Sequence, residues 1–329
     1  MSKIVASEIE RIDIYLAKVL GQSRSQISNL IKNQNVLVNN KVIKSSYKLN
    51  INDEIEINYP DIKDINIKYE ANFDVEILYE DECMLVVNKP NNVATHGCSS
   101  LKEASLVEWL LERNYKLADI NGKIRAGIVH RLDKDTSGVM LVAKSNEAYF
   151  SLANQIKNRE VNRIYLAVTN HTINQNHIEK YIKRNENNRL KMQSLSKDEC
   201  IKKYGLNEDR WGKWARTHFI NLANTNDKAL ISAKLESGRT HQIRTHLASV
   251  NRYILGDSIY ADESSKNKAN RLMLHSFYIN YTHPITNNFM EFYSSNCLSF
   301  NETIKDFKDI KLDLNLAHNL LNQFSNNLE

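Results

Sequence analysis

The sequence predicts an α+β protein of two domains. The chain has 329 residues, and at roughly 150 residues per domain this length suggests two. Short runs rich in Val and Ile, typical of strands, are interspersed with segments whose apolar residues recur at helical spacing. The hydrophobic content of 42% and the charged content of 25% are typical of a soluble globular protein.

The N-terminal third is expected to contain two helices followed by short strands. The second helix is expected to be capped by Ser23 or Ser25, because a Ser side chain can accept a hydrogen bond from the first turn. Asn39 and Asn40 lie between two short apolar runs, and they predict a hairpin because Asn tolerates positive φ. Residues 53–57 alternate polar and apolar side chains, as an exposed strand does.

Residues 15–52 contain many basic side chains and no acidic one. Among the basic residues are Arg24, Lys32 and Lys41. Two interpretations carry equal weight: a solvated basic face with no further role, and a surface that contacts phosphates. The net charge of +5 permits a nucleic-acid partner but does not require one.

A polar loop between two apolar runs is the most informative stretch of the chain. The runs 126–129 and 139–143 are short and rich in Val or Ile, so each predicts a buried strand segment. Between them, residues 130–138 read His-Arg-Leu-Asp-Lys-Asp-Thr-Ser-Gly. Buried strands on both sides hold a loop rigidly, as a catalytic site needs. A plain turn is the alternative, because Asp, Thr, Ser and Gly all suit turns.

Residues 130–138 resemble, without a gap, the signature loop of the RluA family of pseudouridine synthases, which are RNA-modifying isomerases. The resemblance extends in family order over about residues 74–293. It implies the pseudouridine synthase fold, a mixed and largely antiparallel central sheet with flanking helices. It also implies that Asp133 is the catalytic residue and that Arg131 enters the RNA stack where the target base has flipped out.

Three further segments carry the same resemblance. Lys89, which precedes a proline, resembles the family's first motif and is therefore expected near the RNA groove. Tyr165 resembles the family's short tyrosine motif, which implies that it stacks near the flipped uracil and is a candidate general base. Residues 236–247 resemble another motif, in which Arg244 matches the arginine that pairs with the catalytic aspartate. Arg239 of that motif is an RNA-binding candidate.

Residues 10–59 resemble the alpha-L RNA-binding module of a small-subunit ribosomal protein and of some tRNA synthetases. The resemblance implies that the basic residues of this region contact RNA. Gln34 and Asn35 stand where a Gly is usual before the hairpin, and Asn can adopt the left-handed conformation required there. The expected divisions of the chain are an RNA-binding domain at 1–59, a linker at 60–73, a catalytic domain at 74–300 and a helical tail at 301–329.

Residues 170–217 form a basic stretch that also holds Trp211 and Trp214. Basic residues interleaved with aromatic ones suit RNA, through phosphate contacts and base stacking. A solvated insertion with a locally packed Trp pair explains the same composition equally well.

No metal or cofactor is expected. The four cysteines are scattered without metal-type spacing, and His241 and His246 are five residues apart, which does not fit the usual helical pair of zinc ligands. The N-terminus has no apolar segment of the kind that directs secretion, and no apolar stretch is long enough to span a membrane. These observations predict a cytoplasmic protein, which we expect to be a monomer.

The combined expectation is an enzyme that isomerises uridines to pseudouridine, foremost in large-subunit (23S) ribosomal RNA or its precursor particle. Asp133 must be ionised to act at the ribose, and Arg244 is expected to orient its carboxylate bidentately. Tyr165 is expected to remove the C5 proton. Two alternatives stay open: a non-catalytic RNA-binding or ribosome-assembly factor on the same fold, and a hydrolase that uses Asp133 and Asp135 as a carboxylate pair.

Overall fold

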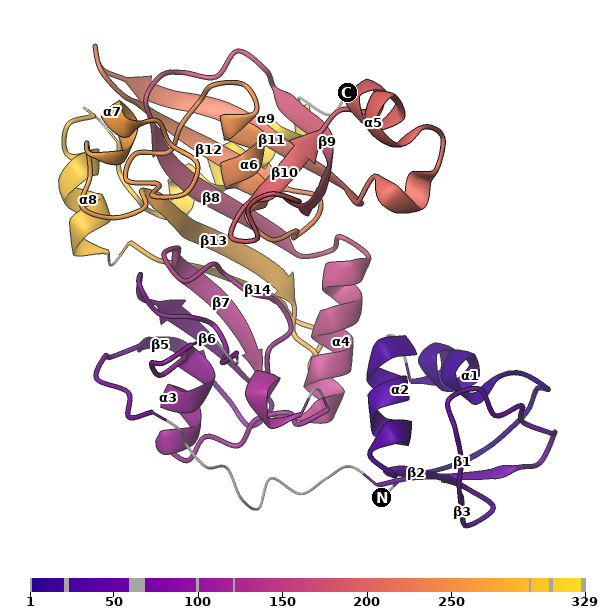
Figure 1. Cartoon of the computed structure of the whole chain (residues 1–329). Helices are drawn as coiled ribbons and strands as arrows, with labels where there is room; N and C mark the ends of the chain where they lie inside the picture. The colour runs from indigo at the N-terminus through magenta and orange to yellow at the C-terminus, as the bar shows by residue number, and fades with distance from the viewer. Residues whose placement is uncertain are drawn as a thin grey trace.

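Figure 1 shows the computed structural model of the chain. It describes residues 2–20, 24–58, 69–98, 101–120, 122–295, 297–307 and 310–326. Within these ranges the strands form one small sheet near the N-terminus and one large mixed sheet with flanking helices. The predicted α+β class with a small N-terminal domain is therefore confirmed.

The N-terminal domain packs two helices, α1 (Ile12–Val19) and α2 (Arg24–Lys32), on a small sheet. The sheet order is β1-β4-β2-β3. Its strands are β1 (Ser2–Val5), β2 (Val36–Val38), β3 (Lys41–Val42) and β4 (Glu54–Ile57). Strand β1 was not predicted. Because β1 and β2 flank β4 on both sides, β4 is not the exposed strand that its alternation suggested, and even Glu56 is buried.

The turns of this domain follow the positions of Asn and Gln. The predicted hairpin is confirmed, since Asn39 (φ 49°) and Asn40 (φ 63°) are both left-handed and β2 pairs with β3. The left-handed residue before the hairpin is Gln34 (φ 59°), where Asn35 was expected. The Gln34 and Asn35 N–H groups donate to carbonyls at the end of α2 and so terminate that helix. Helix α2 begins at Arg24, so Ser25 lies inside the helix and is not its cap, and the other expected cap, Ser23, lies outside the described residues.

The large sheet holds ten strands among the described residues. Along its main path the order is β10-β9-β11-β12-β8-β13-β7-β6-β5, and β14 pairs with β13. The strands are β5 (Glu76–Glu80), β6 (Met84–Lys89), β7 (Ser137–Ala143), β8 (Asn162–Thr169), β9 (His177–Arg184), β10 (Met192–Leu195), β11 (Lys213–Asn224), β12 (Ala229–Leu235), β13 (Leu274–Thr282) and β14 (Phe289–Tyr293). Of the pairings in the described ranges, β7 with β13 alone is parallel.

Helices and loops cover both faces of this sheet, and two apolar cores lie on its two sides. The helices are α3 (Leu106–Glu112), α4 (Asn146–Lys157), α5 (Lys197–Tyr204), α6 (Gln242–Ala248), α7 (Glu263–Lys266), α8 (Leu298–Ile304) and α9 (Leu314–Asn326), with short 3₁₀ turns at Lys123–Arg125 and Glu208–Arg210. Because both faces are covered, every residue of the central strands β6 and β7 is buried.

One expected strand is absent. Residues 126–129 form a turn in which Gly127 (φ 70°) is left-handed and Ile128 alone makes a bridge to Val142. A Cβ at Gly127 would lie 2.6 Å from the Ala143 carbonyl oxygen, so the chain passes too close to β7 for any other residue. The apolar run reflects burial in a tight turn rather than a strand, which corrects the prediction.

The basic stretch 170–217 is mostly folded into the large sheet as β9, β10 and β11, with α5 between β10 and β11. Trp211 is buried in a small separate core with Tyr181, Cys200 and Tyr204. Trp214 instead lies against the Arg159 and Arg216 guanidinium groups. The two tryptophans therefore have different surroundings and do not form the local pair considered above.

The C-terminal tail packs into one of the two apolar cores of the large sheet. Phe300 of α8 and Leu320 and Phe324 of α9 are buried in the same core as β8 and β12. The expected boundary at residue 300 falls inside α8, so the tail shares the core of the catalytic domain. The expected linker lies largely outside the described residues. No helix in the described parts of the chain is both long and apolar enough to cross a membrane.

Candidate active site

The loop that precedes β7 is held against the sheet by a close backbone approach. Gly138 has φ 117°, and a Cβ there would lie 2.1 Å from the Ser276 carbonyl oxygen on β13. Only glycine fits this position. At the start of the loop, Thr95 holds Leu132 by two hydrogen bonds, accepting from its N–H at 3.2 Å and donating to its carbonyl at 2.8 Å. Asp133 lies between these two anchors.

The loop forms one wall of a cavity of about 400 Å³. The other walls come from β8 and from the segment that joins β12 to α6. Five of the predicted site residues line the cavity: Arg131, Asp133, Tyr165, Arg239 and Arg244. Asp135 does not line it, which removes the basis for a hydrolase that uses two neighbouring carboxylates.

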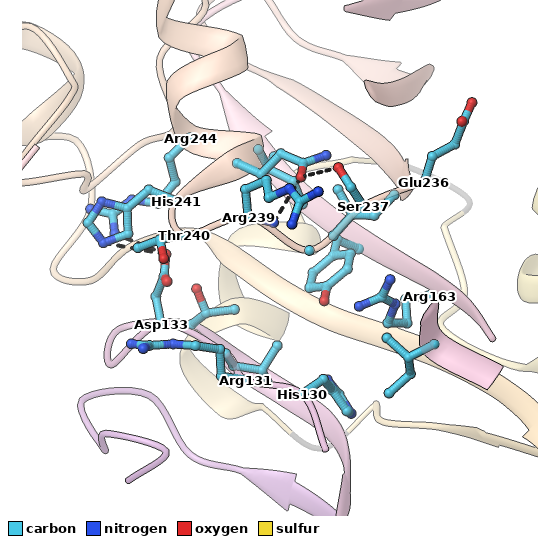
Figure 2. Close-up of a pocket in the computed structure, with 18 of the residues that line it drawn as sticks. His130, Arg131, Asp133, Arg163, Glu236, Ser237, Arg239, Thr240, His241 and Arg244 are labelled. Carbon is cyan, nitrogen blue, oxygen red and sulfur yellow. Dashed lines mark hydrogen bonds and ion pairs between the residues drawn. The ribbon is translucent and has the colours of Figure 1, made fainter. Parts of the chain in front are cut away.

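Arg244 links two aspartates (Figure 2 shows its position above the loop). Its Nη1 donates to Asp133 Oδ2 at 3.3 Å. Its Nε and Nη2 donate to Asp257 Oδ2 and Oδ1, both at 2.8 Å. The expected pairing of Arg244 with Asp133 is therefore present, but the bidentate contact is made with Asp257. This corrects the predicted geometry. Two of the guanidinium donors bond Asp257, so only Nη1 is left for Asp133.

Burial and charge oppose one another at this pair. Burial disfavours the ionised form of Asp257, yet the hydrogen bonds and positive charge of Arg244 hold the pKa of Asp257 below its usual range. The two aspartates in turn outweigh burial and raise the pKa of Arg244, whose side chain is 2% exposed. Arg244 therefore stays charged and fixed, and it presents a single N–H donor to Asp133.

His241 is the second group that faces Asp133. It adopts the left-handed conformation (φ 54°) immediately before α6. Its Nε2 lies 3.9 Å from Asp133 Oδ2, and its Nδ1 is 2.8 Å from the Tyr260 hydroxyl oxygen. His246 points elsewhere, with Nδ1 3.0 Å from the Thr217 hydroxyl oxygen. The two histidines thus have separate partners, and this arrangement does not place them around one metal ion.

Tyr165 lies on β8, where it is paired with Ala233 on one side and Ser276 on the other. Its side chain is 5% exposed and borders the cavity. Burial raises the pKa of Tyr165, while the positive charge of Arg163 opposes that shift. The phenol is therefore neutral at neutral pH, so it can donate a hydrogen bond, and a role as base requires that it first lose its proton.

The structure contradicts the expectation that Lys89 contacts RNA. The Lys89 side chain is completely buried, and its Nζ donates to the carbonyl oxygens of Pro90, Val93 and Lys134 at 2.7, 2.6 and 3.1 Å. Burial lowers the pKa of Lys89 to about 7, and the charges of Asp133 and Asp135 oppose that shift. Its three acceptors match the three N–H donors of the ammonium form. Lys89 therefore supports the loop from behind.

The remaining RNA-binding candidates lie at exposed positions. Arg131 and Arg239 are exposed at the cavity, where Figure 2 shows Arg131 beside Asp133. In the N-terminal domain, Lys32 and Lys41 are exposed. Arg24 is 56% exposed, but its Nη2 donates to the buried Asp13 at 2.8 Å. Part of its guanidinium is thus used within the domain, and contact with RNA stays a prediction for all five residues.

Sequence reasoning gave no role to Asp257, His241 or Tyr260. The stretch 256–260 was recognised as part of the family resemblance, but nothing in its composition indicates that Asp257 holds Arg244. That pairing depends on the segment after α6 turning back on the helix. Only one argument could have pointed to a second acid. A buried Arg has five N–H donors, so contact with a single carboxylate leaves donors unpaired and calls for another buried acceptor.

One group of possible metal ligands lies away from the cavity. Asp81, Cys83 and His283 bring one ligand atom each within 4.8 Å of the others. His283 Nδ1 accepts from two backbone N–H groups, so its Nε2 carries the proton and donates to Asp81 Oδ2 at 2.6 Å. A metal at Nε2 would need that proton to move to Nδ1, where two donors already point. The donor set fits a hydrogen-bonded turn better than a metal site.

Comparisons with known proteins agree with the geometry. The RNA pseudouridylate synthase family model matches residues 83–249, and the S4 domain model matches residues 10–55. An uncharacterised RNA pseudouridine synthase of Helicobacter pylori is 40% identical over 286 residues, covering 85% of each chain. YlyB of Bacillus subtilis, also an uncharacterised RNA pseudouridine synthase, is 36% identical and covers 88% of this chain and 92% of its own. The chain belongs to the RNA pseudouridine synthase family.

Other relatives carry more specific names. The ribosomal large subunit pseudouridine synthase D of Neisseria meningitidis is 35% identical over 83% of this chain and 72% of its own. Among solved structures, human RNA pseudouridylate synthase domain containing 1 superposes with a TM-score of 0.53 at 21% identity, covering 76% of this chain and 98% of its own, which shows the shared fold. The expected isomerase acting on RNA is confirmed, and with it the N-terminal RNA-binding domain.

Proposed function

We propose that this enzyme isomerises uridines of large-subunit ribosomal RNA, with Asp133 as the reacting carboxylate. The observation that carries the role of Asp133 is its single hydrogen bond from Arg244, an arginine that Asp257 fixes in place. The substrate is supported by relatives named as large-subunit synthases, in Neisseria meningitidis, Zymomonas mobilis and Borreliella burgdorferi, at 34–36% identity. The S4 domain supplies a second surface for a large folded RNA.

The reaction breaks the bond from uracil N1 to ribose C1′ and forms one from C5 to C1′. The uridine must leave the stack first, at a cost of a few kcal/mol. Arg131 is exposed at the rim of the cavity, next to Asp133, and is suited to fill the space that the base vacates. The guanidinium stacks readily on neighbouring bases, which offsets part of the cost.

Asp133 has one oxygen available for chemistry. Arg244 and His241 both face Oδ2, and no hydrogen bond to Oδ1 occurs among the residues that the structure describes. The ionised Oδ1 can attack C1′ as a nucleophile or remove the C2′ proton as a base, and both routes release uracil from the sugar. Arg244 stabilises the negative charge and keeps its own proton, because its pKa is raised.

Tyr165 completes the site. After C5 joins C1′, the C5 proton must leave and N1 must gain one. Tyr165 borders the cavity on the side of β8 and is neutral, so we propose that it passes the C5 proton on through its hydroxyl, directly or through water. Its ring can also hold the detached uracil by stacking.

The test is a pseudouridine map of total RNA from cells with and without the gene. We expect specific 23S ribosomal RNA positions to lose pseudouridine in the deletion strain. The wild-type gene should restore them, and a gene encoding Asp133→Asn should not. Loss confined to transfer RNA would refute the proposed substrate while leaving the enzyme class intact. Restoration by Asp133→Asn would refute the role of Asp133.

A further inference from the structure

Tyr260 lies behind His241, outside the cavity. Its hydroxyl oxygen is 2.8 Å from His241 Nδ1 and accepts a hydrogen bond from the Met192 N–H at 2.7 Å. The two rings also meet edge to face, with centroids 5.5 Å apart and planes at 87°. The Arg244 guanidinium lies 5.2 Å from the centre of the Tyr260 ring. One tyrosine therefore contacts both groups that face Asp133.

These contacts determine which ring nitrogen of His241 carries the proton. The Met192 N–H already donates to the Tyr260 oxygen, so the hydroxyl proton is free to be donated to His241 Nδ1. The opposite arrangement would leave the hydroxyl proton without an acceptor among the described residues. Burial raises the pKa of Tyr260 to about 12 and lowers that of His241, so at neutral pH both groups are neutral. Nδ1 is then an acceptor, and Nε2 carries the proton.

The protonated nitrogen faces the catalytic aspartate. His241 Nε2 is 3.9 Å from Asp133 Oδ2, the same oxygen that accepts from Arg244 Nη1. That distance is too long for a hydrogen bond and leaves a gap that a small movement of the loop would close. With that gap closed, two donors on Oδ2 would hold the carboxylate and leave its other oxygen unbonded.

The same tyrosine connects the site to the basic hairpin of β9 and β10. Met192 is the first residue of β10 and directly follows the loop at 185–191, which carries Arg189 and Lys191 on exposed or half-exposed positions. A hydrogen bond inside the protein therefore joins the end of an exposed basic loop to a residue that orients His241. RNA held by that loop would lie next to the element that anchors Tyr260.

We propose that Tyr260 is a positioning residue, which fixes His241 in the tautomer that presents Nε2–H to Asp133 and so orients the carboxylate for reaction. This inference rests on the proposed role of Asp133. Tyr260 does not line the cavity, and its hydroxyl acts through His241, whereas its contact with Arg244 is made by the ring. Met192 of the β9–β10 hairpin supplies the hydrogen bond that leaves the Tyr260 hydroxyl proton available for His241.

The test is a double-mutant cycle between Tyr260→Phe and His241→Gln, measured as the single-turnover rate of pseudouridine formation. Tyr260→Phe keeps the ring contacts and removes the hydroxyl, so we expect a rate about tenfold slower with unchanged RNA affinity. A Gln side chain carries an amide N–H₂ near the position of Nε2 and has no tautomer to select. In the His241→Gln background, Tyr260→Phe should therefore cost less than about twofold.

Nitrogen NMR of the full-length protein with labelled histidine supplies a readout that does not depend on turnover. In wild type, His241 should show a protonated Nε2 and an unprotonated Nδ1, and the His241→Gln spectrum identifies its signals. Tyr260→Phe should shift this balance toward the other tautomer. Tyr253→Phe is the matched control, because its hydroxyl bonds Asn251 on the surface and should affect neither measurement.

The inference is overturned by a wild-type rate for folded Tyr260→Phe, by an equal loss of rate in both backgrounds, or by a wild-type tautomer in the variant. A loss of RNA affinity in place of rate would also overturn it. If wild type makes no pseudouridine in the RNA tested, the proposed substrate fails, and the tautomer measurement still decides the role of Tyr260.

Discussion

The catalytic cavity and the N-terminal domain use positive charge in opposite ways. In the cavity, Arg244 is buried and shared between two aspartates, and Lys89 is buried against three carbonyl oxygens. In the N-terminal domain, Lys32 and Lys41 are exposed. A buried cation with fixed partners holds a reacting group in one geometry, whereas an exposed one can meet phosphates along a flexible backbone. The comparison separates groups expected to serve the chemistry from groups expected to serve RNA affinity, and four variants test it.

The largest effect is expected for Asp133→Asn. This change keeps the size of the side chain and removes the charge that reacts, so turnover should fall by about 10³-fold or more while RNA binding persists. The measurement is tritium release from uridine labelled at C5, together with RNA affinity. Asp135→Asn is the matched control and should lose far less, since Asp135 does not line the cavity. A folded Asp133→Asn enzyme that turns over normally would end the proposed mechanism.

Arg244→Lys should have the next largest effect. Lysine keeps the charge but cannot bond Asp257 bidentately and Asp133 at once, so Asp133 loses its fixed donor. We expect the rate to fall by about 10²-fold and the melting temperature to drop. Arg252→Lys, which changes an arginine bonded to backbone carbonyls away from the cavity, is the control. If Arg244→Lys melts lower but reacts at the normal rate, the arginine serves stability alone.

Lys89→Met should act on stability before it acts on chemistry. Methionine fills the space but leaves three carbonyl acceptors unpaired, so we expect unfolding to become easier by about 2–4 kcal/mol. The measurement is urea unfolding, read alongside turnover at a temperature where the variant is folded. Lys266→Met, at an exposed lysine paired with Glu263, should change little. Unchanged stability of Lys89→Met would contradict the supporting role of this side chain.

The smallest effect is expected for Lys32→Gln combined with Lys41→Gln. Each lysine that contacts a phosphate adds to the salt dependence of binding, so the slope of log affinity against log salt should become shallower by between about one and two. The rate at saturating RNA should not change. Titrations of long RNA at several KCl concentrations measure the slope. If the rate at saturating RNA falls while the salt slope is unchanged, these lysines contribute to the reaction and not to RNA affinity.

Much of the fold could be predicted from local pattern. Strand β7 was predicted because a short apolar run rich in Val is typical of a buried strand. The run at 126–129 was also predicted to be a strand but forms a turn, because composition cannot show that Gly127 passes within van der Waals distance of β7. Strand β4 was misjudged because alternation does not reveal that β1, from the start of the chain, pairs with its outer edge.

The site could be predicted only as far as the family resemblance reached. Asp133, Tyr165 and Arg244 were named from motifs, and they do share one cavity. Lys89 was misplaced because a lysine is charged in any sequence, and whether it meets phosphates or buried carbonyls depends on how the chain folds around it. Asp257 was missed because its hydrogen bonds with Arg244 form only when the segment after α6 folds back onto the helix. The spacing of the two residues in the sequence does not reveal this contact.

The single parallel pairing among the described strands of the large sheet has a consequence for the order in which the site assembles during synthesis. Strand β13 joins β7 through two residue pairs, His275 with Ser137 and Ser276 with Gly138, and it inserts between β7 and β8, which are made much earlier. Asp133 lies in the loop before β7, and Arg244 lies on α6, which follows β12. A ribosome making this chain therefore releases Asp133 long before Arg244, and β13 only after both. Until β13 emerges, the growing polypeptide has its complete first domain but lacks the strand that joins β7 to β8 beside Asp133.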